Sequence, residues 1–129
     1  MPHAWVEYSN NIGAEPELRN IGKAVYDAML ETGIFPIAGI RVRVNRVDEY
    51  LVGDLQPDRS FVHLSIRIGE GRDMATKKAA ADHIFARLSS HLKPLADRQP
   101  LAFAFEMQEI PSAFSYKMNN LRQYISAQS

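Results

Sequence analysis

Residues 61–72 read FVHLSIRIGEGR, and this stretch decides the fold. Its apolar side chains occupy every second position, which is the period of a β-strand with one buried face. These residues are Val62, Leu64, Ile66 and Ile68. The glycines of GEGRD then form a tight turn, after which Asp73 is the expected N-cap of a helix. The stretch therefore predicts a strand that leads directly into a helix.

The segment that follows completes a β-α-β unit. Apolar residues four positions apart predict a helix that ends where Pro94 removes a backbone N–H. They are Ala80, Ile84, Leu88 and Leu92. Residues 101–108, LAFAFEMQ, alternate large apolar side chains with small or polar ones and predict another strand. A short amphipathic helix is expected around Met118, Leu121 and Ile125.

The first half of the chain shows the same order of elements. Residues 3–9 alternate as a strand does, Pro16 suits the first turn of a helix, and Gly33 stops that helix. Between these two positions, apolar residues recur at helical spacing: Leu18, Ile21, Val25 and Met29. In the strand after this helix, Arg41 and Arg43 lie on one face and alternate with apolar residues.

The chain is therefore predicted to be one domain, residues 1–129, made of two β-α-β halves at about 1–58 and 59–129. We expect an α+β fold, with α/β character in each half, in which two helices cover one face of a four-stranded mixed sheet. The other face is left to water or to a partner. Trp5 and His63 in its strands favour a partner.

Composition excludes several classes of function. Fifteen basic residues balance fifteen acidic ones, so no bulk charge draws the chain to nucleic acid or to an anionic membrane. The chain has no cysteine, which excludes disulfides, a thiolate nucleophile and zinc–thiolate sites. No apolar run has the length of a membrane span, and we expect a cytoplasmic protein. The four histidines show no metal-ligand spacing, so no metal or cofactor is expected: His3, His63, His83 and His91.

Pro2 stands directly behind the start methionine, and two interpretations are open. Proline lacks a backbone N–H and is tolerated as the first residue of a strand. If Met1 is removed, the same residue has a free secondary amine and becomes a base at the end of a strand.

Arginines in unusual places are the other candidates for chemistry. Arg72 lies where a strand leads into a helix N-terminus, a position suited to anions. Arg41 and Arg43 alternate with apolar residues and need a partner or a ligand. On these residues alone, surface ion pairing is the preferred interpretation.

Four stretches together resemble a known family. They are MPHAWVEYSNNI at 1–12, TGIFPIAGIRVRV at 32–44, FVHLSIRIGEGR at 61–72 and FEMQEI at 105–110. Over nearly the whole chain they are similar to the 5-carboxymethyl-2-hydroxymuconate delta-isomerase family of the tautomerase superfamily. The resemblance implies a tautomerase-like homotrimer in which Pro2, exposed by removal of Met1, is the catalytic acid and base. It also implies that Arg41 and Arg72 bind the carboxylates of the substrate.

The resemblance favours a cofactor-independent isomerase. It would move a double bond and a proton in an unsaturated 2-hydroxy di- or tricarboxylate during aromatic catabolism, as in the homoprotocatechuate pathway. One alternative is a tautomerase of another keto/enol acid, such as an arylpyruvate. Another is a non-catalytic ferredoxin-like binding module, in which neighbouring strands would be antiparallel. The expected partners are a small carboxylate and further copies of the chain, with no nucleic acid and no membrane.

Overall fold

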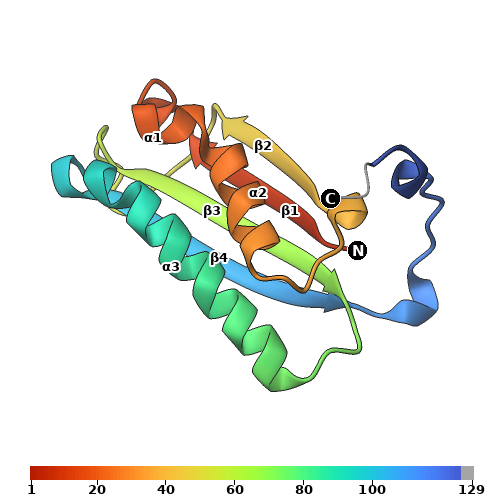
Figure 1. Cartoon of the computed structure of the whole chain (residues 1–129). Helices are drawn as coiled ribbons and strands as arrows, with labels where there is room; N and C mark the ends of the chain where they lie inside the picture. Colours follow the sequence, from red (N-terminus) through yellow and green to blue (C-terminus); the bar gives the residue numbers. More distant parts are fainter. Residues whose placement is uncertain (126–129) are drawn as a thin grey trace.

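Two consecutive β-α-β units form the fold, which the computed structural model describes for residues 1–125. The first contains β1 (His3–Ser9), α1 (Pro16–Arg19), α2 (Ile21–Glu31) and β2 (Arg41–Val47), and the second contains β3 (Ser60–Gly69), α3 (Met74–Arg98) and β4 (Leu101–Ile110). Figure 1 shows all three helices in front of one sheet. The two β-α-β units and the single layer of helices predicted from the sequence are therefore confirmed.

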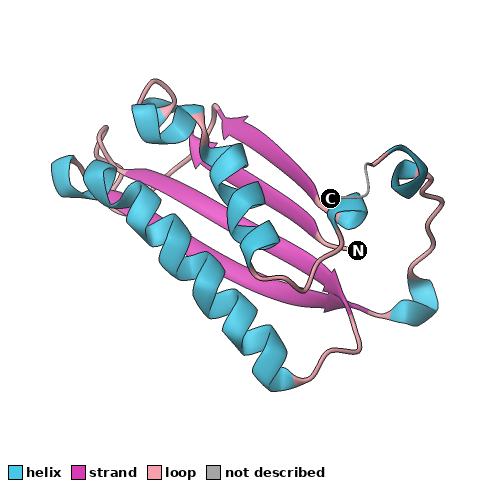
Figure 2. Ribbon diagram, in the orientation of Figure 1, coloured by secondary structure: helices cyan, strands magenta, loops and turns pink. Residues whose placement is uncertain are grey.

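The strands lie in the order β2-β1-β3-β4 (Figure 2). Within each unit the two strands are parallel neighbours, with His3 opposite Arg41 and Ser60 opposite Leu101. The units join through an antiparallel pair in which His3 lies opposite Arg67. As a result, the starts of β1 and β2 meet the ends of β3 and β4 at one end of the sheet.

This topology is incompatible with the ferredoxin-like alternative. In the split β-α-β arrangement, another strand lies between the two strands of each unit. Here β1 pairs directly with β2, and β3 pairs directly with β4. Each unit therefore consists of two neighbouring parallel strands joined through helices. This strand order excludes the ferredoxin-like binding module.

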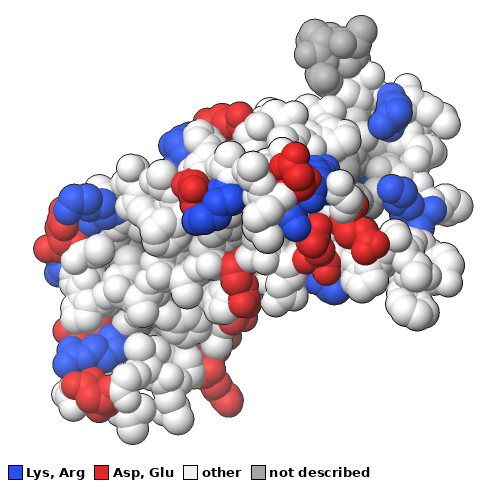
Figure 3. All heavy atoms as spheres, turned by 90° about the horizontal axis from the view of Figure 1, so that it is seen from below, with Lys and Arg blue, Asp and Glu red and all other residues white. Residues whose placement is uncertain are grey.

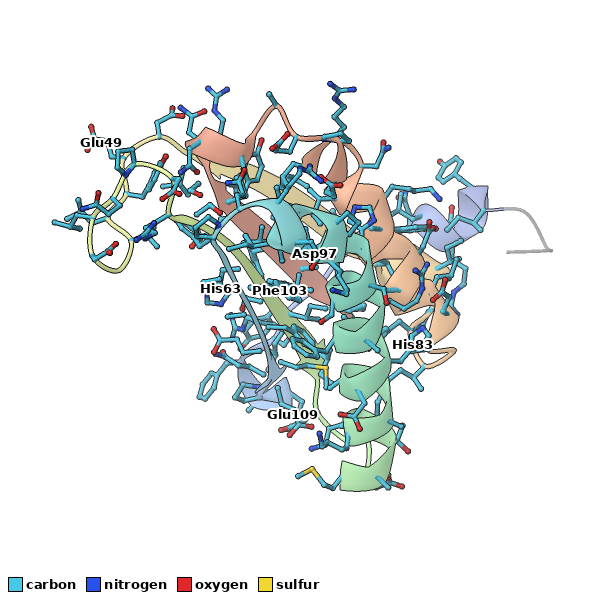
Figure 4. The ribbon with its side chains drawn as sticks, turned by 90° about the vertical axis from the view of Figure 1, so that its left-hand side faces the viewer. Glu49, His63, His83, Asp97, Phe103 and Glu109 are labelled. Carbon is cyan, nitrogen blue, oxygen red and sulfur yellow. The ribbon has the colours of Figure 1, made fainter. Side chains whose placement is uncertain are left out.

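The core lies between the sheet and the helices. Alternate residues of β1 and β3 are completely or almost completely buried there: Ala4, Val6, Val62, Leu64, Ile66 and Ile68. The helices contribute buried residues at helical spacing: Ile21, Val25, Met29, Ile84, Leu88 and Leu92. His63 lies on the opposite face of the sheet, away from α3, as Figure 4 shows. The period read from residues 61–72 thus identifies the buried side of the sheet.

Three local predictions were wrong. The helix expected from Pro16 to Gly33 divides at Asn20, whose φ of −118° and ψ of 21° are not helical. Helix α3 continues through Pro94 to Arg98. A proline inside a helix costs about 3 kcal/mol. The continued helix, however, buries Leu95 completely, and this burial stabilises the end of α3 against the sheet.

The third wrong prediction concerns the end of the chain. The amphipathic helix expected around Met118, Leu121 and Ile125 is instead an extended segment followed by a short 3₁₀ helix at Leu121–Tyr124. Met118 is fully exposed. The segment, drawn in blue in Figure 1, runs beside the amino-terminal end of β1.

Charged side chains are spread over the surface. On the face drawn in Figure 3, acidic and basic groups lie interspersed. Three exposed ion pairs lie one helical turn apart in residues 1–125: Lys23 with Asp27, Lys78 with Asp82, and Lys93 with Asp97. Within residues 1–125, no helix is long and apolar enough to cross a membrane.

Candidate active site

Pro2 is buried directly before β1 and is held by a hydrogen bond from the first residue of β2. Its carbonyl oxygen accepts a hydrogen bond of 3.2 Å from the backbone N–H of Arg41. Gly39 lies so close that a Cβ added there would be 3.3 Å from Cδ of Pro2. A larger residue at position 39 would therefore press on the proline ring. With Met1 in place, the nitrogen of Pro2 is a peptide amide.

Two pockets meet at Met1. One has a volume of about 540 Å³ and includes the loop after β3. Its lining comprises Met1, His3, Gly69, Glu70, Gly71, Arg72, Ile110, Ser112, Ser115, Tyr116 and Lys117. The other has about 560 Å³ and includes the turn before β2. Its lining comprises Met1, Pro36, Ala38, Gly39, Lys117, Asn119, Asn120, Arg122 and Gln123.

Arg41 is held at this end of the sheet by main-chain carbonyl groups. Its Nη1 donates to the carbonyl oxygen of Gly39 at 2.9 Å and to that of Ala38 at 3.4 Å. No carboxylate in residues 1–125 forms a salt bridge with it. Neutral carbonyl groups orient the guanidinium without cancelling its charge, so the group can still attract an anion.

Arg72 is held in the same way and joins the two halves of the chain. Its Nη1 donates to the carbonyl oxygen of Gly69, the last residue of β3, at 3.2 Å, and its Nη2 donates to that of Ile34 at 2.9 Å. The guanidinium also lies 5.2 Å from the ring centroid of Phe35, in cation–π contact. In the described part of the chain, no salt bridge neutralises it either.

The terminal amine lies in a cationic environment. Burial lowers the pKa of the Met1 amine, and the positive charges of Lys117, Arg72 and Arg41 lower it further. Both effects disfavour the ammonium form.

The structure places Pro2, Arg41 and Arg72 at one end of the sheet, where Arg72 lines one of the two pockets and Pro2 and Arg41 line neither. Arg43 lies elsewhere: its guanidinium is 4.6 Å from the ring centroid of Trp5, and its Nη2 is 3.4 Å from Nδ1 of His3. The GEGR glycines form the strand-to-helix turn, and Oδ1 of Asp73 accepts from the N–H of Thr76 at 2.7 Å, so the predicted cap is confirmed.

The other histidines lie far from this end or make local contacts. Nε2 of His63 lies 3.2 Å from Oε1 of Glu106, and Nε2 of His83 lies 2.7 Å from Oε1 of Glu31. His83 and His63 are labelled in Figure 4 on opposite sides of the sheet. Within residues 1–125, no group of three or more His, Cys, Asp or Glu side chains is arranged to hold a metal ion.

Sequence reasoning missed the contribution of the carboxyl-terminal segment. Lys117 lines both pockets, and Tyr116 and Arg122 each line one. The apolar spacing that predicted a helix in this segment did not show that the segment runs over the surface as a loop. Its basic and aromatic residues were the available signal, but nothing in the sequence showed where the segment returned.

The strand order and the helices on one face of the sheet are those of a tautomerase-like fold. A macrophage migration inhibitory factor-like protein from Entamoeba histolytica shares this fold, with a TM-score of 0.63 and 16% identity over 90% of this chain and 95% of that one. The pattern of the 5-carboxymethyl-2-hydroxymuconate isomerase family matches residues 2–125. The chain belongs to that family.

Two relatives are similar to this chain over nearly their whole length. The 5-carboxymethyl-2-hydroxymuconate delta-isomerase of Escherichia coli is 37% identical over 121 residues, which cover 94% of this chain and 96% of the relative. The crystal structure of a 5-carboxymethyl-2-hydroxymuconate isomerase from Deinococcus radiodurans R1 has a TM-score of 0.87 and 34% identity. That match covers 97% of this chain and 95% of the other.

Proposed function

We propose that this protein isomerises 5-carboxymethyl-2-hydroxymuconate in the catabolism of aromatic compounds, with the nitrogen of Pro2 as acid and base and without a cofactor. The observation that carries the proposal is the position of Pro2. It is buried at the end of the sheet that also holds Arg41 and Arg72, in a chain that matches this family from residue 2 onward. The proposal requires the removal of Met1, which turns the amide of Pro2 into an amine.

The reaction needs one group that first accepts and then donates a proton. A 2-hydroxy-2,4-diene acid loses the proton of its hydroxyl group and becomes a ketone at carbon 2. The electrons of the two double bonds shift to leave one double bond between carbons 3 and 4, and carbon 5 takes up a proton. The number of protons on the substrate is unchanged, so a single base can return the proton that it removed.

The surroundings of the amine suit this task. An unperturbed terminal amine has a pKa of about 8 and is mostly protonated at neutral pH. Burial and the charges of Lys117, Arg72 and Arg41 lower the pKa of the amine at this end of the chain. We infer that the amine of Pro2, one residue further in, is affected in the same direction and is available as a base.

Arg41 and Arg72 are proposed to bind carboxylates of the substrate. Each guanidinium is already oriented by carbonyl oxygens on one side, so its other N–H groups remain for a ligand. Their charges also favour the negative charge that develops as the dienol loses its proton. Lysine at either position would lose the planar arrangement of donors.

We further propose that the protein is a cytoplasmic homotrimer whose subunits meet through the open face of the sheet. That face contains Trp5 under the guanidinium of Arg43, and Nη1 of Arg43 is buried without a hydrogen-bond partner in residues 1–125. A buried unpaired guanidinium nitrogen is costly. A neighbouring subunit that supplies an acceptor would remove this cost, and sedimentation velocity would show the trimer.

The decisive experiment compares the wild type with Pro2→Ala after the intact mass of each has been measured. The wild type should lack Met1, and Pro2→Ala should lose about 100-fold in kcat, as expected for the loss of a positioned acid–base group. Pro57→Ala, in an exposed loop, is the matched control and should keep full turnover. Active protein that still contains Met1, or full turnover by Pro2→Ala, would overturn the mechanism.

A substrate panel tests the substrate class separately. Turnover of 5-carboxymethyl-2-hydroxymuconate should exceed that of phenylpyruvate, which has one carboxylate and leaves one arginine without a partner. Faster turnover of the arylpyruvate would favour the other keto/enol tautomerase and would leave the role of Pro2 intact.

A further inference from the structure

The carboxyl-terminal segment of residues 111–120, here called the strap, is pinned across the candidate active site at two points. Near its start, the N–H and Oγ of Ser112 donate to Oε2 of Glu70 at 3.1 and 2.9 Å. Near its end, Nδ2 of Asn119 donates to the carbonyl oxygen of Ala38 at 3.0 Å. The strap is therefore fixed to both loops that shape the site.

Each anchor point lies near one of the two arginines. The carbonyl oxygen of Ala38 accepts from Arg41 as well as from Asn119. Glu70 lies two residues before Arg72 in the loop after β3. The strap thus spans from the neighbourhood of one guanidinium to that of the other. Between its anchors, Ser115, Tyr116 and Lys117 line the pocket that also includes Arg72.

Lys117 is the cation of the strap. It lines both pockets, as Met1 does. No carboxylate in residues 1–125 forms a salt bridge with its ammonium group. Of the three cations that lower the pKa of the Met1 amine, Lys117 has the largest effect. Its charge therefore acts within the site and is not neutralised by a neighbour.

The charge count of the substrate leaves one group without a partner. Muconate has two carboxylates and the carboxymethyl arm adds a third, whereas Arg41 and Arg72 account for two. We propose that Lys117 binds the third carboxylate and makes the site selective for tricarboxylates over dicarboxylates. This inference rests on the proposed function. A lysine on a pinned but exposed strap suits the role, because its single ammonium group can follow a carboxylate on a flexible arm.

The test measures binding, so that it does not depend on turnover. The probes are hexanedioate and 2-(carboxymethyl)hexanedioate, which differ only by the carboxymethyl arm. Calorimetric titration should show that the wild type binds the tricarboxylate about 10-fold more tightly, the size expected for one charged hydrogen bond. Lys117→Met should lose this preference while binding hexanedioate as the wild type does, and Lys117→Arg should restore it.

Matched controls separate the possible outcomes. Lys93→Met removes an equally long cation on the exposed side of α3, where Lys93 pairs with Asp97, and should keep the preference. Equal weakening of both probes by Lys117→Met, or no change in either, would overturn the proposal. If the preference behaves as expected but the wild type does not isomerise 5-carboxymethyl-2-hydroxymuconate, the proposed function fails and the tricarboxylate site remains.

Discussion

The backbone N–H of Arg41 donates a hydrogen bond of 3.2 Å to the carbonyl oxygen of Pro2. This bond places the first residue of one parallel strand beside the first residue of its neighbour, in the register that pairs His3 with Arg41. The position of the proline ring and the position of an arginine side chain are therefore set by the same strand pairing.

Gly39→Ala should lower turnover with little change in stability. The new Cβ would lie 3.3 Å from Cδ of Pro2, so the ring must move by a few tenths of an ångström. We expect kcat to fall about 10-fold, because small displacements of a catalytic group are costly. Gly13→Ala is the control, since its Cβ would meet the carbonyl oxygen of Asn10 at the same 3.3 Å, but at the opposite end of β1. Equal kcat for the two variants would contradict the prediction.

Arg72→Lys should raise KM more than it lowers kcat. The guanidinium donates from separate nitrogens to Gly69 and Ile34 while it covers the ring of Phe35, and one ammonium group cannot do all of this and bind a carboxylate. Steady-state kinetics should show KM raised about 10-fold, the loss of one charge-assisted hydrogen bond. Arg19→Lys, on the exposed side of α1, should leave both constants unchanged. An unchanged KM in Arg72→Lys would show that this arginine does not bind substrate.

Glu31→Gln should destabilise the protein at neutral pH and have a diminishing effect in acid. Hydrogen bonds from Arg87 and His83 lower the pKa of Glu31 to about 2. A carboxyl group with a lowered pKa in the folded state stabilises the fold above its unfolded-state pKa and loses this contribution as pH falls through the folded-state value. Urea unfolding should show the difference between wild type and variant shrinking between about pH 4.5 and about pH 2. A constant difference across this range would assign the effect to packing.

Ser9→Ala should destabilise the fold without altering KM. The side chain of Ser9 is fully buried, and its Oγ accepts from the backbone N–H of Phe61 at 3.0 Å. Removing the acceptor leaves a buried donor unpaired, which costs about 1–3 kcal/mol. Urea unfolding of Ser9→Ala and of Ser90→Ala, an exposed residue of α3, should differ by this amount. Equal midpoints would show that water replaces the lost acceptor.

The sequence predicted the sheet well because its signal is local. The alternation of residues 61–72 identifies β3 and its buried face, and the similar order of elements in the two halves predicts the two units. The break at Asn20 and the continuation past Pro94 depend on tertiary packing. At Pro94, the burial of Leu95 compensates for a lost hydrogen bond, and no local pattern reports that burial.

The site could be predicted only in part, for the same reason. Pro2, Arg41 and Arg72 belong to stretches that resemble a family, so their association was expected before any geometry was known. Lys117 belongs to a segment whose position depends on two side-chain anchors, Ser112 on Glu70 and Asn119 on Ala38. Such long-range contacts have no sequence period, so the path of the strap could not be predicted.

The internal repeat does not give the chain a second free amino terminus. In both units the first strand buries alternate residues, beginning at Pro2 before β1 and at Ser60 in β3. Ser60 is therefore the counterpart of Pro2, but its nitrogen lies in mid-chain as a peptide amide. Duplicating the architecture cannot duplicate the proposed base, because a linear molecule has a single amino terminus. Each further proposed catalytic centre therefore requires another copy of the chain.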